Sequence, residues 1–327
     1  MRFFFAFVLA LVVGVVGAGY SWLGAPFDLP TPTVDLSIEP GVSGRDIAIA
    51  VRDAGVPVNP GLLYAWFRLS GQARQIRAGS YELDRNTTPR SLLQKLVRGE
   101  EALRSVTLVE GWTFRQVREA LQKAEQLRAD SVAMSPTEIM SQLDRAGVPA
   151  EGHFFPDTYT YSKGSSDLAV LRRALHAMDK RLAAAWALRD PRSPLKDPEQ
   201  ALVLASIVEK ETGTQSDRAT ISAVFSNRLA LGMRLQTDPT VIYGMGTSFD
   251  GNLRKRDLQT DTPWNTYTRA GLPPTPIAMP GKAALLAAVQ PTPSKALYFV
   301  ARGDGSSQFS SSLDEHNRAV NKYQRGQ

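Results

Sequence analysis

The stretch "ALVLASIVEKE", residues 201–211, joins an apolar run to two carboxylates. Ala201 to Val208 are small or aliphatic except for Ser206, and Glu209 and Glu211 follow at once. Burying a carboxylate against apolar side chains costs free energy unless the group is paired or becomes protonated. The stretch therefore predicts a helix whose glutamates are either satisfied by a partner or used with a raised pKa.

The helical spacing separates the two glutamates. At about 100° per residue, Glu211 falls on the stripe of Leu204 and Ile207, while Glu209 falls with Ala205, so the carboxylates point to nearly opposite sides. Glu211 lies nearer the bulky apolar residues and is the better candidate for a desolvated acid that donates a proton to a leaving oxygen. The alternative is that both are ordinary exposed residues at a fraying helix end.

Glu209 has two candidate partners, because Arg218 and Arg228 follow in the next predicted segment. Further along, the segments 220–246 and 262–285 carry amides, hydroxyls and aromatic rings, and the second also holds five prolines. Rigid loops of this composition suit a carbohydrate, whose hydroxyls need polar partners and whose C–H faces stack on rings; the alternative is that they only brace a long connection. The candidate cleft residues are Asn227, Gln236, Asp238, Asn265 and Tyr267.

Composition excludes several classes of protein. The chain has 327 residues, 43% of them hydrophobic, and a formal net charge of +6 without any block of like charges, so nucleic-acid binding is not expected. There is no cysteine, and the three histidines are far apart in sequence, so we expect neither disulfides nor a metal site. No phosphate-binding loop, G-x-S-x-G elbow or dinucleotide fingerprint is present, and no cofactor is expected.

The N-terminus predicts a membrane anchor. Residues 3–23 carry no charge, and about 20 apolar residues are enough to cross a bilayer. A cleaved signal peptide is the alternative, but its apolar region would be shorter, and Tyr20 and Trp22 are typical of interface anchors. Arg2 favours a cytoplasmic N-terminus.

The rest of the chain predicts an α+β protein. We expect an anchor at 1–24, a proline-rich linker at 25–33, a module at 34–103 and a larger domain at 104–327. The module reads as strand, two helices and strand, followed by a helix; Ser43 is the predicted cap of its first helix, which Gly55 ends. Its βααβ pattern is similar to that of a LysM domain.

Four motifs carry a resemblance to a known family: "ASIVEKET" (205–212), "NRLALGMRLQTDPTVIYGMG" (227–246), "WNTYTRAGLPPTPIAMPG" (264–281) and "YFVARGDGSSQFSSSLDEHN" (298–317). Together with the upstream "VEGWTFRQV" and "EGHFFPDTYTY", they resemble the endolytic murein transglycosylases of the MltG (YceG-like) family. The resemblance runs from about residue 30 to the end, and Trp264 is a small departure from it.

The resemblance implies an inner-membrane protein with its catalytic domain in the periplasm. Such an enzyme cleaves the β-1,4 bond between N-acetylmuramic acid and N-acetylglucosamine in nascent peptidoglycan strands without water, leaves 1,6-anhydromuramic ends and terminates glycan elongation. The motif aligns the family's catalytic glutamate with Glu211, although a shift to Glu209 stays open. If Glu211 is catalytic, Glu209 and His316 are expected to contact the substrate. Peptidoglycan synthases are possible partners.

Two other functions remain open at this point. The first is a non-catalytic peptidoglycan-binding protein that works through the LysM-like module. The second is a hydrolytic muramidase, which would need a second carboxylate across the cleft, with Asp238 and Asp261 as candidates.

Overall fold

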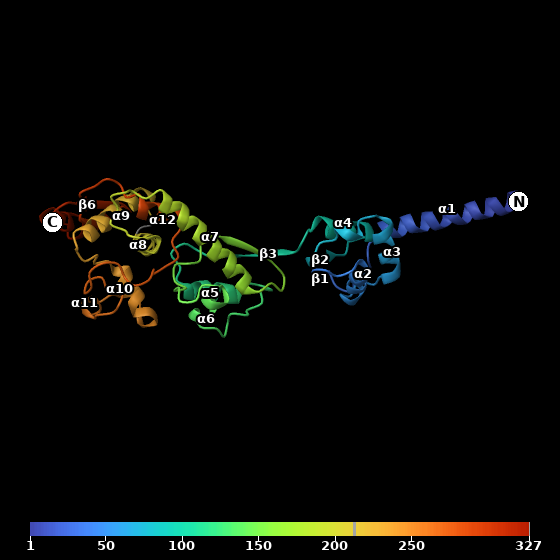
Figure 1. The fold of residues 1–327 in the computed structure, drawn as a ribbon, viewed down its shortest axis with the longest axis horizontal. Coiled ribbons are helices and arrows are strands. Elements are labelled where there is room, and N and C mark those ends of the chain that lie inside the picture. The colour runs from blue at the N-terminus through green and yellow to red at the C-terminus, as the bar shows by residue number, and fades with distance from the viewer. Residues whose placement is uncertain (212–213, 327) are drawn as a thin grey trace. The chain divides into compact units, whose positions relative to one another are not determined.

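The computed structural model describes residues 1–211 and 214–326, which form two compact units, and each is described by itself (Figure 1). Unit 1 comprises residues 1–104 and 160–165, and unit 2 comprises 105–159 and 166–327. The mixture of helices and short two-stranded sheets confirms the α+β class. The elements of unit 1 are α1 (Arg2–Gly24), β1 (Thr33–Ile38), α2 (Gly44–Asp53), α3 (Pro60–Leu69), β2 (Gly79–Asp84) and α4 (Pro89–Arg98).

The predicted strand–helix–helix–strand order of unit 1 is confirmed. β1 and β2 pair antiparallel, with Thr33 opposite Asp84 and Ile38 opposite Gly79. Ser43 caps α2 by accepting a hydrogen bond from the Asp46 amide, and Gly55 takes the positive φ of 102° that the turn after this helix needs. The assignment of this unit as a LysM-like module stays a prediction.

The segment between α1 and β1 packs against unit 1. Phe27 and Leu29 are buried in the same core as Leu36 and Leu93, and the Phe27 amide donates to the Thr87 carbonyl at 2.9 Å. This segment is therefore held by apolar burial and a backbone hydrogen bond, although its prolines predict a stiff exposed linker. Within the described residues, one helix is long and apolar enough to cross a bilayer: residues 3–24, with mean hydropathy 2.4 and none of it buried in the protein.

Helix α8 is central to unit 2. Residues 201–208 are all buried, and the helix packs against α7, α9 and α12, which accounts for its nearly all-apolar surface (Figure 1). Its N-terminal turn is capped by Asp197, which accepts from the Gln200 amide at 2.8 Å. The helices of unit 2 are α5 (Phe114–Lys123), α6 (Pro136–Gln142), α7 (Asp167–Ala187), α8 (Pro198–Glu211), α9 (Gln215–Ala230), α10 (Asp238–Met245), α11 (Lys255–Gln259), α12 (Lys282–Val289) and α13 (Leu313–Gln324).

The strands outside unit 1's β1–β2 pair are short. The hairpin β5 (Tyr298–Ala301) and β6 (Ser307–Ser310) pairs Tyr298 with Ser310, as the Gly-Asp-Gly turn predicts. β3 (Leu103–Thr107) pairs with β4 (Thr158–Ser162), which lies in a segment that its sequence predicts as an aromatic loop.

The proline-rich segment 262–280 contains no helix or strand, as its sequence predicts, yet part of it is buried. Ile277 and Met279 are almost inaccessible, and the Ile277 amide donates to the Ser206 hydroxyl on α8 at 2.9 Å. This segment is therefore hydrogen-bonded to α8, the helix that carries Glu209 and Glu211.

Candidate active site

The C-terminal turn of α8 directs its two glutamates to different partners. Glu211 accepts a hydrogen bond from the Thr237 hydroxyl, just before α10, whereas Glu209 accepts one from the Gly281 amide at 2.8 Å, just before α12. This arrangement agrees with the opposite helical faces that the spacing predicts. Each carboxyl therefore has a separate environment, and the two do not form a dyad.

Glu211 lines a cavity of about 490 Å³. The cavity's walls come from the end of α8, the start of α10, the β5 strand and α13, so segments far apart in sequence meet around one carboxyl. Four other residues predicted for the site lie in the same cavity: Gln236, Asp238, Tyr267 and His316.

The surroundings of Glu211 favour its protonated form. Burial raises the pKa of this carboxyl, the hydrogen bond from Thr237 lowers it, and the negative charge of Asp238 raises it. Burial is the largest of the three effects, so the net shift is upward. A carboxyl with a raised pKa can hold a proton near neutral pH and deliver it to a leaving oxygen.

Asp238 and Tyr267 form a pair at the mouth of the cavity. The Tyr267 hydroxyl donates to Asp238 Oδ1 at 2.6 Å, and burial together with this carboxylate raises the pKa of Tyr267. Gln236, two residues earlier, has a positive φ of 51° and an exposed side chain. These three residues offer hydroxyl, carboxylate and amide groups to a polar ligand beside Glu211.

His316 faces the cavity from α13. Its ring stacks on Tyr298 with centroids 5.2 Å apart, and Nδ1 is buried with no hydrogen-bond partner among the described residues. Burial and the nearby Arg228 lower the pKa of His316, which favours the neutral imidazole. Tyr298 begins the motif 298–317, but whether a strand residue faces a cavity depends on tertiary packing, so its place in the site was not predicted.

Glu209 is satisfied inside the protein. Its side chain is 7% exposed, and one oxygen lies 3.6 Å from Arg218 Nη2, so Arg218 is the partner and Arg228 is not. Burial raises the pKa of Glu209, while the Gly281 amide and Arg218 lower it. Glu209 is not one of the described residues that line the Glu211 cavity. The structure thus gives Glu209 a bracing position between α8, α9 and the start of α12.

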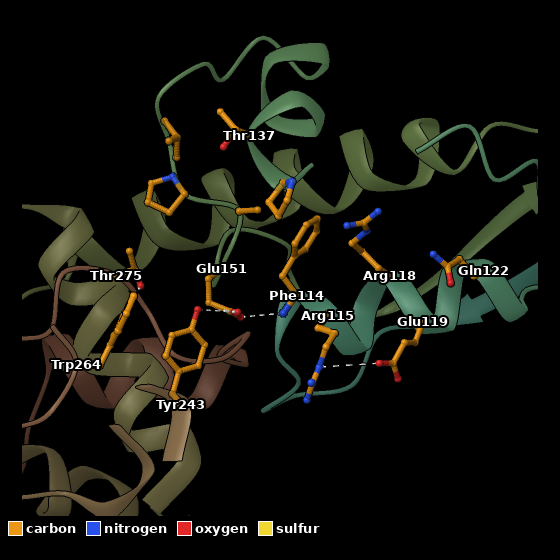
Figure 2. A pocket seen from close by; sticks show the side chains of 14 residues that line it. Phe114, Arg115, Arg118, Glu119, Gln122, Thr137, Glu151, Tyr243, Trp264 and Thr275 are labelled. Carbon is orange, nitrogen blue, oxygen red and sulfur yellow. Dashed lines mark hydrogen bonds and ion pairs between the residues drawn. The ribbon is translucent and has the colours of Figure 1, made fainter. Parts of the chain in front are cut away.

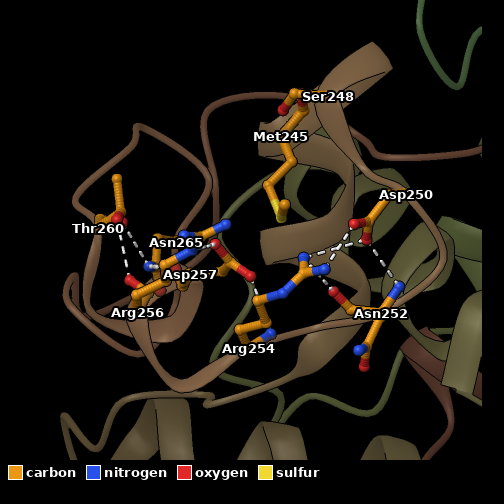
Figure 3. A network of polar contacts seen from close by, with 9 residues as sticks. All are labelled: Met245, Ser248, Asp250, Asn252, Arg254, Arg256, Asp257, Thr260 and Asn265. Atoms are coloured by element: carbon orange, nitrogen blue, oxygen red, sulfur yellow. Dashed lines mark hydrogen bonds and ion pairs between the residues drawn. The ribbon is translucent and has the colours of Figure 1, made fainter.

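Two predicted cleft residues are used for internal hydrogen bonds. Asn227 donates to the carbonyls of Ser294 and Ala296, both at 2.9 Å. Asn265 is fully buried and donates to the carbonyl of Thr260 at 2.7 Å (Figure 3). Its side-chain oxygen accepts from the Tyr267 amide at 2.8 Å. Neither side chain reaches the Glu211 cavity, and Asn265 instead shapes the loop that presents Tyr267.

A further half-buried carboxyl, Glu151, was not predicted. It accepts from the Phe114 amide at 2.9 Å and from the Tyr243 hydroxyl at 3.1 Å, and burial raises its pKa to about 7 (Figure 2). It lines a second cavity, of about 800 Å³, together with Trp264 and Thr275. The signal in the sequence is a single Glu-Gly pair, residues 151–152, beside an aromatic run.

Comparison with known proteins agrees with this layout. The YceG-like family matches residues 36–322. The chain is 30% identical over 315 residues to the endolytic murein transglycosylase of Bacillus subtilis (strain 168), which covers 89% of this chain and 85% of the relative. It is 28% identical over 320 residues to the protein of the same name in Streptococcus pneumoniae serotype 2 (strain D39), covering 88% of this chain and 58% of that longer relative.

A solved structure has a similar fold. The crystal structure of a yceG-like protein from Listeria monocytogenes superposes with a TM-score of 0.55 at 28% identity, over 88% of this chain and 98% of that one. The family match spans both units, and it includes the end of α8 and the segments that surround Glu211. This chain belongs to the YceG-like family.

Proposed function

We propose that this protein is a lytic transglycosylase that cleaves the β-1,4 bond between N-acetylmuramic acid and N-acetylglucosamine within peptidoglycan strands. The observation that carries the proposal is Glu211, a carboxyl with a raised pKa in a cavity lined by polar and aromatic side chains. The relatives from Bacillus subtilis and Streptococcus pneumoniae are named endolytic murein transglycosylases, which supports the same substrate class.

One carboxyl is enough for this reaction. Glu211, protonated in the free enzyme, donates its proton to the glycosidic oxygen as the bond from that oxygen to C1 of the muramic residue breaks. The resulting carboxylate then takes the proton from the C6 hydroxyl of the same residue as that oxygen attacks C1. The products are a strand with a free 4-hydroxyl and a 1,6-anhydromuramic end; water is not consumed, and Glu211 is protonated again.

The substrate's own N-acetyl group is the proposed stabiliser of the positive charge that develops at C1. Asp238 is the other carboxylate among the described residues that line the cavity, and its charge raises the pKa of Glu211. Asp238, which is hydrogen-bonded to Tyr267, is also the carboxylate that a hydrolytic muramidase would use, so a hydrolytic muramidase is the second candidate function. Asp261 does not suit that role, because it is exposed and paired with Arg269 at 2.8 Å.

The proposed cellular setting follows from α1 and from the substrate. We assign α1 as an uncleaved anchor in the inner membrane, with unit 2 and the remainder of unit 1 in the periplasm, where nascent glycan strands are made. Cleavage within such strands would end their elongation, which makes peptidoglycan synthases the expected partners. The LysM-like unit would add contacts to the same glycan.

The test is the release of soluble fragments from purified murein by the full chain in detergent. We expect Glu211→Gln to reduce the rate at least about 10²-fold with an unchanged melting temperature, because it removes the proton donor but keeps the shape. Glu209→Gln is the matched control and should retain cleavage per folded molecule. Loss of activity in the Glu209 variant alone would move the catalytic role to Glu209, and full activity in both would refute the proposal.

A further inference from the structure

The cavity around Glu151 lies outside the proposed reaction, yet it is built as a binding site. It measures about 800 Å³, within the range of pockets that hold small ligands. Its walls come from α5, the loop before Glu151, α10 and the segment 264–275, all within unit 2 (Figure 2). No step of the cleavage described above uses any group in it.

The walls present aromatic surface on both sides of the Glu151 carboxyl (Figure 2). Tyr243 and Trp264 meet edge to face with centroids 5.5 Å apart, and Phe114 lies on the other side of Glu151 (Figure 2). The Trp264 indole N–H is held by the Thr275 hydroxyl at 2.9 Å, which fixes the ring's orientation. Rigid aromatic faces of this kind stack on the apolar C–H faces of a sugar ring.

Glu151 supplies the polar centre. One oxygen accepts from the Phe114 amide and the other from the Tyr243 hydroxyl, so the carboxylate is fixed by both walls and retains acceptor capacity toward the cavity. Gly152, which follows it, has a φ of +82°, and a Cβ there would lie 2.3 Å from Pro276. The backbone is thus shaped to hold Glu151 in place, and a ligand that donates an N–H or O–H would complete its hydrogen bonds.

The cations of the cavity are partly engaged. Arg115 lies 3.9 Å from Glu119, and Arg118 Nη2 donates to the carbonyls of Ser131 and Val132 at 3.2 and 3.1 Å, while Arg118 Nε is buried without a hydrogen-bond partner among the described residues. Arg118 Nε can therefore donate to a ligand carbonyl, and Glu151 can accept from a ligand N–H or O–H. N-acetylated sugars carry both the carbonyl and the donors.

The two cavities of unit 2 share structural elements. Asp238 at the start of α10 lines the Glu211 cavity and Tyr243 lines the Glu151 cavity, a rise of about 7.5 Å along the helix. Trp264 lines the Glu151 cavity, and Tyr267, three residues later in the same loop, lines the Glu211 cavity. The two cavities thus share α10 and this loop as walls, with Asp238 and Tyr243 on different faces of the helix, so a linear polymer long enough to pass around α10 can occupy both.

We infer that the cavity of Phe114, Glu151, Tyr243 and Trp264 is a distal subsite for N-acetylated sugars of the glycan strand, at a distance from the bond that is cut. This inference rests on the proposed function for its substrate. It predicts that the protein gains affinity from strand length and that Glu151 supplies part of that gain.

The experiment measures binding by isothermal titration calorimetry with the full chain in detergent, in a Glu211→Gln background so that the ligand is not consumed. The probes are peptide-free glycan fragments of peptidoglycan, a tetrasaccharide and an octasaccharide. Adding Glu151→Gln should weaken octasaccharide binding about tenfold, which is about 1.4 kcal/mol, and leave tetrasaccharide binding unchanged. Tyr243→Phe, which removes only the hydroxyl that orients Glu151, should act in the same direction, and Glu39→Gln in unit 1 is the matched control.

Two results would overturn the inference: unchanged octasaccharide affinity in the Glu151 and Tyr243 variants, or an equal loss for both lengths. If Glu151→Gln lowers the melting temperature sharply, Tyr243→Phe decides. Failure of the cleavage proposal is a separate observation, because it would appear as absent or hydrolytic products from the unmodified protein while the binding comparison stands by itself.

Discussion

The hydrogen bond between Thr237 and Glu211 predicts how the pH dependence of cleavage can be moved. Thr237 is 2% exposed, and its hydroxyl donates to Glu211, which stabilises the ionised form and lowers the pKa of the carboxyl. Thr237→Val removes this donor and nearly keeps the shape of the side chain. The pKa of Glu211 should therefore rise.

The direction of the shift follows from the strength of the bond. A hydrogen bond to a charged group contributes about 1.5–3 kcal/mol, more than one between neutral groups, so loss of the donor destabilises the carboxylate more than the neutral acid and raises the pKa of Glu211. As the proton donor, Glu211 is active when protonated, and activity is lost as the pH rises through its pKa. The alkaline limb of kcat/KM against pH, which reports the free enzyme, should move upward by the same amount.

Asp238→Asn provides the opposite perturbation in the same cavity. The charge of Asp238 raises the pKa of Glu211, less strongly than Thr237 lowers it, so removing the charge should move the alkaline limb downward by a smaller amount. Asparagine can still accept the hydrogen bond from Tyr267, which keeps that contact. Limbs that stay in place, or that move in the same direction in both variants, would refute the role of Glu211 as the titrating acid.

Three further predictions concern stability, measured by urea denaturation. Glu209→Gln should cost about 2 kcal/mol, because it leaves the mostly buried Arg218 unpaired; an unchanged midpoint would contradict the bracing position of Glu209. Asn265→Ala should cost about 3 kcal/mol, since several buried carbonyls lose their donor, and a loss below about 1 kcal/mol would contradict this. In the folded state the pKa of Glu151 is about 7, above its ordinary value of 4.5, so between these pH values the folded state binds a proton that the unfolded state has lost. The free energy of unfolding should therefore fall by up to about 3 kcal/mol as the pH rises from 4.5 to 7. Glu151→Gln should abolish this fall, and an unaltered pH profile in that variant would count against the assignment.

The local elements were predictable because their signals lie close together in sequence. Ser43 and Gly55 mark the ends of α2, and the apolar run 201–208 marks a buried helix, since each signal acts within a few residues. The opposite faces of Glu209 and Glu211 followed from helical geometry alone. The choice of Arg218 over Arg228 as the partner of Glu209 did not, because it depends on how α9 packs against α8.

The cavity lining was less predictable, because polar residues in a loop can point inward or outward. Asn265 and Tyr267 are two residues apart, yet the first is used for backbone carbonyls and the second reaches the cavity. Tyr298 and Glu151 each begin a segment that carries the family resemblance, yet nothing in those segments shows which cavity either side chain enters. Which side chains meet is decided by tertiary packing, and a single sequence carries little information about that.

The most direct test of the central claim is mass spectrometry of the fragments that the full chain releases from purified murein. Non-hydrolytic cleavage by Glu211 predicts products with 1,6-anhydromuramic ends, lighter by one water than hydrolytic products and missing with Glu211→Gln. Products that carry reducing muramic acid would contradict the account and would make Asp238 the carboxylate to study next.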